Sequence, residues 1–233
     1  MATMQLELRD SVHVLTLTNN DNENKFNMDV MAEYSAALDT VAAYEGNTAL
    51  LITCEHEKTF STGIDLAWLM SETPENQIIF TRAIERVLYK LAMLNAPSVV
   101  CVNGNVYAGA AIMATAADYR VMRSDRGRYC YPEVNIGIPF TDLMNHIVDL
   151  SPNKHVLKKM ALEGKALTGV ECKAANLVDS IYPQAELQEA AFALAKSLSE
   201  KARSTYTTIK RGLRPNIAKY EYILSEDAVA LLV

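Results

Sequence analysis

The sequence predicts an α/β fold in which buried strands alternate with amphipathic helices. Two short apolar runs, Ala49–Cys54 and Ser98–Val102, have the length and composition of strands that are buried on both faces. Helical periodicity separates these runs, and most of the chain after residue 140 is helical in pattern. With 233 residues, the chain is long enough for one large domain with a substantial core.

The N-terminal segment is expected to form a hairpin followed by a helix. Apolar and polar side chains alternate in two runs, 4–9 and 12–18, which flank a turn-like Asp-Ser pair. The side chain of Asn27 can cap a helix over residues 28–44, which carries apolar residues at helical spacing. The order strand, strand, helix, strand then recurs loosely along the first half of the chain.

The rest of the chain continues with helices and fewer strands. Thr73 and Pro74 form a helix start, and Pro97 marks its end because the residue before a proline is disfavoured in a helix. The middle elements are expected as helices at 66–72 and 74–94, a strand at 98–102, a helix from 109 to near 118 and a strand at 119–123. Later helices are expected at 141–150, 151–163, 168–176, 186–203, 205–213 and 218–232, with an extended piece at 177–182.

Composition and charge exclude several classes of function. The formal net charge of −6 argues against non-specific nucleic-acid binding, which needs a basic surface. No run approaches the roughly 18 apolar residues of a membrane helix, and the acidic N-terminal residues do not resemble a secretory signal. The four cysteines are widely spaced and no Cys/His cluster has metal-ligand spacing. We therefore expect a cytoplasmic protein with buried free thiols and no metal.

Two strand-to-helix turns form the first part of a candidate site. Residues 61–63 are turn-like and residues 64–66 begin a helix, while Asn103-Gly104 and the small residues 108–111 also lead from a strand into a helix. Backbone N–H groups at helix starts favour negative charge, and Gly109 leaves room for a ligand. Two such turns aimed at one point would form an oxyanion hole. The alternative for residues 108–111 is a close-packed contact without a ligand.

A carboxylate in an apolar stretch forms the second part of this site. Glu133 follows Pro132 and is surrounded in sequence by tyrosine, valine and isoleucine. Apolar surroundings raise the pKa of a carboxyl group towards neutral pH, which suits general acid–base catalysis. The alternative is a surface carboxylate at the end of a strand.

Together, these motifs resemble those of the enoyl-CoA hydratase/isomerase superfamily, the crotonases. Its Ser/Ala-x-Gly-x-Asp-Leu turn corresponds to residues 61–66, its Asn-Gly with a small-residue helix start to 103–111, and its Pro-Glu motif to 132–137. The resemblance implies a crotonase-like spiral of ββα units over residues 1–185. It also implies a C-terminal helical trimerisation region over residues 186–233.

The resemblance further implies an acyl-CoA thioester as substrate and fatty acid β-oxidation as the setting. Coenzyme A would be part of the substrate, no further cofactor would be needed, and the chain would form a homotrimer or a dimer of trimers. The backbone N–H groups of Ile64 and Gly109 would form the oxyanion hole, and Glu133 would move the proton. Substrate contacts are expected from Lys25, Ser61, Gly63, Asp65, Leu66, Tyr107 and Ala108.

One departure from the family pattern favours a particular reaction. Hydratases of the family use two glutamates, and counting from Gly109 puts Ile112 at the first of these positions. The single carboxylate of Glu133 could still carry a proton between two carbons, which is the Δ3-to-Δ2 enoyl-CoA isomerase reaction. The residues around Glu133 and at 60–68 are similar to those of small plant-type isomerases. The alternatives are 2-enoyl-CoA hydration, decarboxylation, acyl-CoA hydrolysis, or a catalytically silent acyl-CoA-binding protein.

Several other residues have two interpretations. Lys25 lies where the family places a contact to CoA phosphates, but an isolated lysine in a polar loop is usually solvated. Asp65 can cap a helix rather than touch substrate, and Tyr107 can line the acyl pocket or simply pack. Four residues could line the acyl pocket or belong to the core: Trp68, Leu69, Met70 and Phe80. Three cations could meet CoA phosphates across a subunit boundary or form a solvated face: Lys210, Arg211 and Arg214.

Overall fold

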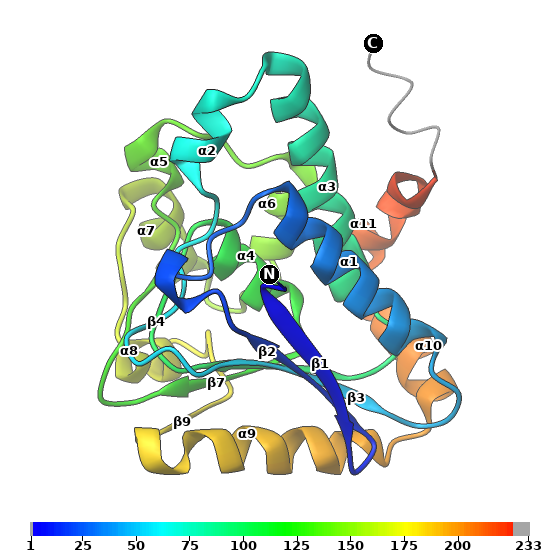
Figure 1. Cartoon of the computed structure of the whole chain (residues 1–233). Helices are drawn as coiled ribbons and strands as arrows, with labels where there is room; N and C mark the ends of the chain where they lie inside the picture. The colour runs from blue at the N-terminus through cyan, green and yellow to red at the C-terminus, as the bar shows by residue number, and fades with distance from the viewer. Residues whose placement is uncertain (1, 226–233) are drawn as a thin grey trace.

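The computed structural model describes residues 2–225 as two sheets surrounded by helices (Figure 1). The larger sheet has the strand order β1-β2-β3-β5-β7-β9, and the smaller sheet has the order β4-β6-β8. β1 and β2 form the predicted antiparallel hairpin, and the other neighbouring strands pair in parallel. The strands are β1 (Met4–Arg9), β2 (Val12–Leu17), β3 (Ala49–Cys54), β4 (Thr59–Ser61), β5 (Ser98–Val102), β6 (Asn105–Tyr107), β7 (Tyr119–Arg123), β8 (Tyr129–Cys130) and β9 (Ser180–Tyr182).

Most helices match the predicted segments, with shifts at several ends, but the short helices at 133–136 and 215–218 were not predicted. The helices are α1 (Met28–Ala43), α2 (Leu66–Ser71), α3 (Pro74–Ala92), α4 (Gly109–Ala116), α5 (Glu133–Ile136), α6 (Asp142–Val148), α7 (Lys154–Glu163), α8 (Gly169–Ala174), α9 (Gln184–Ser199), α10 (Arg203–Leu213) and α11 (Pro215–Ala218), with 3₁₀ helices η1 (Asn20–Asn22) and η2 (Lys219–Leu224). Asn27 and Thr73 cap α1 and α3 as predicted. α7 begins later than predicted because its N-cap is Asn153. Of the helix expected at 218–232, residues 219–224 form the 3₁₀ helix η2 instead, and residues 226–232 lie outside the described residues.

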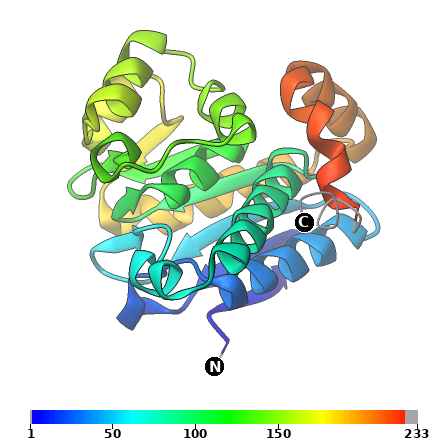
Figure 2. The ribbon, with the colours of Figure 1, turned by 90° about the horizontal axis from the view of Figure 1, so that it is seen from above.

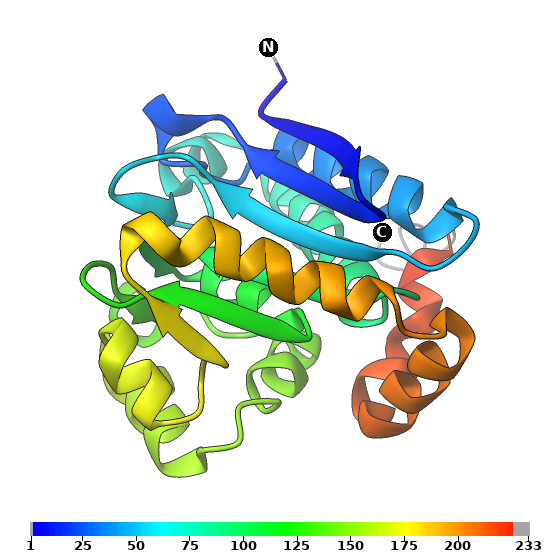
Figure 3. The same ribbon diagram turned by 90° about the horizontal axis from the view of Figure 1, so that it is seen from below.

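The larger sheet is buried between two helical layers. α9 lies across one face of the sheet, which Figure 3 shows from below. Alternate residues of a strand point to opposite faces. Accordingly, Leu51 and Val99 pack with Leu187 of α9, whereas Leu50 and Ile52 join the main core on the opposite face. The prediction of doubly buried strands at Ala49–Cys54 and Ser98–Val102 is therefore confirmed.

The smaller sheet gives the fold its repeating unit. β4, β6 and β8 each follow a strand of the larger sheet and each precede a helix, namely α2, α4 and α5. This is the predicted ββα spiral, although the three short strands themselves were not predicted. Their connections are so close that a Cβ on Gly104 would overlap the backbone of Lys58. Glycine in the Asn103-Gly104 pair is therefore required by the crossing of two chain segments.

The C-terminal helices pack beside the segment that carries α5 to α8, with contacts between α11 and α6. Figure 2 shows α10, α11 and η2 in orange and red on one side and the green-to-yellow segment on the other. α9 belongs to the sheet by its contacts, and the division of the chain after residue 185 stays a prediction. Within residues 2–225, no helix is long and apolar enough to cross a membrane.

Candidate active site

The two predicted strand-to-helix turns lie against each other. Gly63 has a φ of +80°, and a Cβ on it would lie 2.8 Å from the carbonyl oxygen of Tyr107 and 2.9 Å from the nitrogen of Gly109. Such contacts leave room for glycine alone. Phe26 holds the first turn in place, because its N–H donates to the carbonyl of Gly63 at 2.8 Å and its carbonyl accepts from Asp65 at 2.9 Å. The expectation that the two turns meet is confirmed.

Both backbone N–H groups predicted for the oxyanion hole belong to residues that line one cavity. Gly109 is the first residue of α4, so its N–H has no partner inside the helix. No acceptor for the N–H of Ile64 or Gly109 is found among residues 2–225. These two donors are therefore available to a ligand atom in the cavity.

Strain is stored at the residue that precedes the second donor. Ala108, the N-cap of α4, has φ 52° and ψ −132°, a conformation that residues other than glycine rarely adopt. A backbone of this kind costs on the order of 1–3 kcal/mol and persists only when its surroundings enforce it. Here the N–H of Ala108 donates to the carbonyl of Cys130 at 3.1 Å, and Gly63 packs against its Cβ. These two contacts hold Ala108 in this conformation at the start of α4.

Glu133 is a buried carboxylate, not a surface one. Glu133 is the first residue of α5 and is 7 % exposed. It lines the same cavity as Ile64 and Gly109. Burial raises the pKa of this carboxyl group to about 7. Its Oε2 atom has no hydrogen-bond partner in the part of the chain that the structure describes. The predicted apolar surroundings of Glu133 are confirmed.

The cavity has a volume of about 440 Å³ and is mostly apolar. Glu133 is the one carboxylate among its described lining residues, and Ile112 lies on the same wall as Gly109, one turn along α4. The lining also includes Leu66, Leu69, Phe80, Ile84, Tyr107, Ala108, Cys130, Ile136, Ile138, Phe140, Thr141 and Met144. A more open hollow of about 860 Å³ adjoins it beyond Ile138 and Phe140, between α5, α6 and α7.

The predicted substrate-contact residues divide into three groups, of which Lys25 alone forms the third. Leu66, Tyr107 and Ala108 line the cavity. The other residues of the first motif shape its turn instead. Ser61 donates to the carbonyl of Asn24 at 2.8 Å and accepts from the N–H of Gly63 at 3.1 Å, and it is fully buried. Asp65 caps α2 by accepting from the N–H of Trp68 at 3.2 Å, as the capping interpretation predicted.

Lys25 lies next to this turn but outside the cavity lining. Its ammonium group is 3.8 Å from a carboxylate oxygen of Glu23 and its side chain is one-third exposed. It directly precedes Phe26, whose backbone pairs with Ile64. A contact from Lys25 to CoA phosphates stays a prediction.

The proposed acyl-pocket wall is partly confirmed. Phe80 and Leu69 line the cavity, and Trp68 supports Phe80 from behind in an edge-to-face contact with ring centroids 4.8 Å apart. Met70 is 77 % exposed and is not part of the wall. Thr141, the N-cap of α6, and Met144 within that helix also line the cavity and were not predicted. Helical periodicity predicts the helix, but it does not show which side of the helix faces the cavity.

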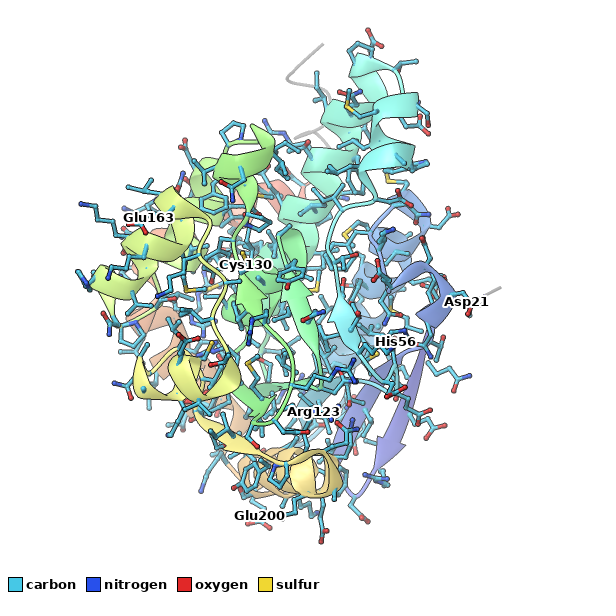
Figure 4. The ribbon with its side chains drawn as sticks, turned by 90° about the vertical axis from the view of Figure 1, so that its left-hand side faces the viewer. Asp21, His56, Arg123, Cys130, Glu163 and Glu200 are labelled. Atoms are coloured by element: carbon cyan, nitrogen blue, oxygen red, sulfur yellow. The ribbon has the colours of Figure 1, made fainter. Side chains whose placement is uncertain are left out.

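Cys130 lines the cavity beside Glu133 and was predicted only as a buried thiol. It is 4 % exposed, and burial raises the pKa of its thiol to about 11. A thiol in this state is a poor nucleophile at neutral pH. Figure 4 shows Cys130 in the middle of the molecule, with Asp21 and Glu163 at opposite edges.

Both interpretations of the C-terminal cations were wrong for Lys210 and Arg214. Lys210 lies 2.7 Å and Arg214 3.0 Å from the carboxylate of Asp118, and all three side chains are largely buried. They therefore neither form a solvated face nor reach towards CoA. A cluster of lysine and arginine is usually solvated, but here its partner Asp118 lies far away in the sequence and could not be recognised from the local pattern. Arg211 is exposed and pairs with Glu221, which fits the solvated interpretation.

The model of the family "Enoyl-CoA hydratase/isomerase" matches residues 7–224. This chain belongs to that family. Enoyl-CoA delta isomerase 3 of Arabidopsis thaliana is 32% identical over 222 residues, which cover 92% of this chain and 93% of that protein. The peroxisomal enoyl-CoA delta isomerase 2 of the same plant is 29% identical, covering 91% and 92%.

Solved structures agree on the fold. An enoyl-CoA hydratase/isomerase family protein from Pseudomonas syringae superposes with a TM-score of 0.85 at 22% identity, covering 93% of this chain and 92% of that one. An enoyl-CoA hydratase from Bacillus anthracis gives 0.84 at 17% identity, covering 99% and 95%. The crotonase fold predicted from the three motifs is therefore confirmed, while the roles of the individual site residues stay predictions.

Proposed function

We propose that this family member is an enoyl-CoA isomerase that moves a double bond from the Δ3 to the Δ2 position. The observation that carries the proposal is the buried carboxyl group of Glu133, whose Oε2 has no partner among the described residues, in a cavity with no second acid among its described lining residues. The names of the plant relatives support the same reaction.

In the proposed mechanism, the thioester oxygen accepts hydrogen bonds from the N–H groups of Ile64 and Gly109. Negative charge develops on this oxygen when a proton leaves C2, and one such donor is typically worth about 3 kcal/mol of barrier. The N-terminal end of α4 adds a favourable dipole. The Glu133 carboxylate takes the C2 proton, and the resulting dienolate extends over C2, C3 and C4. Return of the same proton to C4 leaves the double bond between C2 and C3.

The state of Glu133 suits this double role. A base that must later act as an acid works best when its pKa is close to the working pH, and burial raises this pKa to about 7. Ile112 occupies the position of the first glutamate of the hydratases, so a water molecule would lack one of its two partners. Both features favour proton transfer within the substrate over addition of water.

The test is a comparison of two substrates and two variants. The purified protein is incubated with a 3-enoyl-CoA and, separately, with a 2-enoyl-CoA in water, and the products are separated by chromatography. We expect the first substrate to give the 2-enoyl-CoA, and we expect Glu133→Gln to lower kcat by about 10²–10⁴-fold, the usual contribution of a general acid–base group. The control Glu163→Gln, an exposed carboxylate on α7, should leave kcat unchanged.

Other outcomes identify the alternatives. Hydration of the 2-enoyl-CoA without isomerisation of the 3-enoyl-CoA would make the protein a hydratase. Release of free CoA would indicate a hydrolase. Tight binding of acyl-CoA with no turnover that Glu133→Gln removes would leave an acyl-CoA-binding protein.

We also infer a homotrimer or a dimer of trimers, acting in fatty acid oxidation. Several large apolar side chains are exposed on the single chain and would be available to an interface, among them Met70, Ile78 and Ile79 on α2 and α3. Light scattering should then give three or six times the chain mass of 25.8 kDa. A mass equal to that of one chain would contradict this assembly.

A further inference from the structure

Three buried hydroxyl groups meet near the C-terminal end of α4, outside the cavity lining. The hydroxyl of Thr115 lies 2.7 Å from that of Tyr129 and 2.5 Å from that of Tyr131. Thr115 and Tyr129 also donate to the carbonyl of Ala111 at 2.9 and 2.7 Å. The three side chains are at most 4 % exposed, and none of them lines the cavity. We call Thr115, Tyr129 and Tyr131 the hydroxyl cluster.

The hydrogen bonds of the hydroxyl cluster are satisfied internally. Thr115 and Tyr129 direct their protons to Ala111, which leaves the Thr115 oxygen to accept from Tyr131. Burial raises the pKa of both tyrosines, so both stay protonated and able to donate. A buried and satisfied network of this kind rigidifies the elements that it joins.

The hydroxyl cluster joins the two halves of the candidate active site. Thr115 belongs to α4, the helix that starts with the oxyanion donor Gly109. Tyr131 stands two residues before Glu133 in the chain, with only Pro132 between them. On the cavity side, the same two segments are joined by the hydrogen bond from Ala108 to Cys130. Hydrogen bonds therefore tie the Glu133 segment to α4 at two places, the start of the helix and a point near its end.

We propose that the hydroxyl cluster is a positioning device that fixes the Glu133 carboxyl group relative to the oxyanion donor of Gly109. The cluster touches neither substrate nor the reacting atoms, so it acts only through these two residues. The inference rests on the proposed isomerase function. It adds residues to that function whose side chains carry no catalytic chemistry of their own.

The effect on the reaction should be large because proton transfer is sensitive to geometry. A displacement of about 1 Å between reacting groups can cost about 10²-fold in rate. Removal of one hydroxyl also leaves a buried partner without its hydrogen bond, which loosens the segment and lets water reach Glu133. Greater hydration of a carboxyl group stabilises its charged form, so its pKa should fall from about 7.

The experiment compares Tyr131→Phe and Thr115→Val with Tyr34→Phe as the matched control. Tyr34 is equally buried, and its hydroxyl has no partner among the described side chains. We expect both cluster variants to lower kcat about 10- to 100-fold while KM changes less than about threefold. The lower limb of their pH–rate profile should move to lower pH. Thr115→Ser keeps the hydroxyl and should restore both values, whereas Tyr34→Phe should change neither.

A second measurement separates this inference from the proposed function. The carboxyl group of Glu133 can be titrated by carbon-13 NMR in the unliganded protein and assigned by its absence in Glu133→Gln. We expect its pKa to fall in Tyr131→Phe and in Thr115→Val, but not in Tyr34→Phe. An unchanged titration and an unchanged kcat in folded cluster variants would overturn the inference. A shifted titration in a protein that isomerises no 3-enoyl-CoA would support the positioning of Glu133 and reject the reaction.

Discussion

The molecule buries two carboxylates in opposite ways. Asp118 lies between two cations, Lys210 at 2.7 Å and Arg214 at 3.0 Å, and also accepts from the N–H and hydroxyl of Ser98 at 2.9 and 3.1 Å. Glu133 is 7 % exposed and has an oxygen without any partner among the described residues. The role of a buried carboxylate therefore depends on its ionic and hydrogen-bond partners rather than on burial alone. A paired carboxylate holds structure, whereas an unpaired one keeps a proton that it can transfer.

The surroundings of Asp118 explain why it is structural. Lys210 also donates to the carbonyls of Leu94 and Ala96, at 2.8 and 3.0 Å, in the segment that follows α3. Arg214 donates to the carbonyls of Ala92 and Ala116, at 2.6 and 2.8 Å, where α3 and α4 end. These helix ends have carbonyl groups without partners inside the helix. The cations thus serve one carboxylate and two helix ends at once.

The largest effect is expected when Asp118 loses its charge. Asp118→Asn leaves Lys210 and Arg214 buried without their counter-ion, and removal of one partner of a buried ion pair costs about 3–5 kcal/mol of stability. Urea unfolding at pH 7.5 measures this change in the free energy of unfolding. The control Asp21→Asn removes an exposed carboxylate from η1 and should cost less than about 0.5 kcal/mol. Equal stability of the two variants would mean that the ion pairs contribute nothing.

The same chemical change at Glu133 should have the opposite sign. The folded protein raises the pKa of Glu133 from 4.5 to about 7 by burial. The native carboxyl group therefore binds its proton more tightly than the unfolded chain does, and the free energy of unfolding falls as pH rises through this window. Glu133→Gln removes this loss, so its stability relative to wild type should increase by about 2–3 kcal/mol between pH 5 and pH 8. A difference that stays constant with pH would show that Glu133 titrates normally.

A second acid in the cavity would sharpen the comparison further. Ile112→Glu places a carboxyl group on the wall of α4, where a hydratase has its first glutamate. We expect hydration of 2-enoyl-CoA to increase by up to about 10²-fold, the lower end of what a positioned acid–base group contributes. Ile112→Gln has nearly the same shape without the acid and controls for disruption of this buried position. Equal rates of 2-enoyl-CoA hydration by the two variants would contradict the role assigned to the missing carboxylate.

The smallest effect is the pH dependence of the reaction itself. Glu133 must be ionised to take the C2 proton, so kcat/KM should rise with pH and level off above its pKa of about 7. At pH 6 the rate should be about tenfold below the plateau, because about one carboxyl group in ten is then ionised. A profile that is flat between pH 5 and pH 8 would assign the base to another group.

Local signals in the sequence were sufficient for most of the fold and for the centre of the site. The hairpin, the doubly buried strands and the caps of α1 and α3 follow from periodicity and capping residues within a few positions of one another. Ile64, Gly109 and Glu133 were found because each belongs to a short motif, and the structure brings all three to one cavity.

Features that depend on distant parts of the chain were not predicted. β4, β6 and β8 are only two or three residues long, which is too short for an alternating pattern. Lys210 and Asp118 are separated by many residues, so the charge pattern of α10 gave no sign of its partner. The hydroxyl cluster combines α4 with β8, and a tyrosine or a threonine within an apolar segment is indistinguishable from ordinary core.

Arg203, Lys210 and Arg214 are synthesised after the helix ends and the segment that they bind. Arg203 donates to carbonyls at the end of α1, Arg214 does the same for α3 and α4, and Lys210 donates to a carbonyl in the segment after α3. All three belong to α10 or its C-cap, and a ribosome makes α1, α3 and α4 before them. The nascent chain must therefore carry three unfinished helix ends until residue 214 has emerged from the exit tunnel. Just before that point, the nascent chain would expose the unpaired carbonyl groups of these helix ends to chaperones that bind incomplete chains.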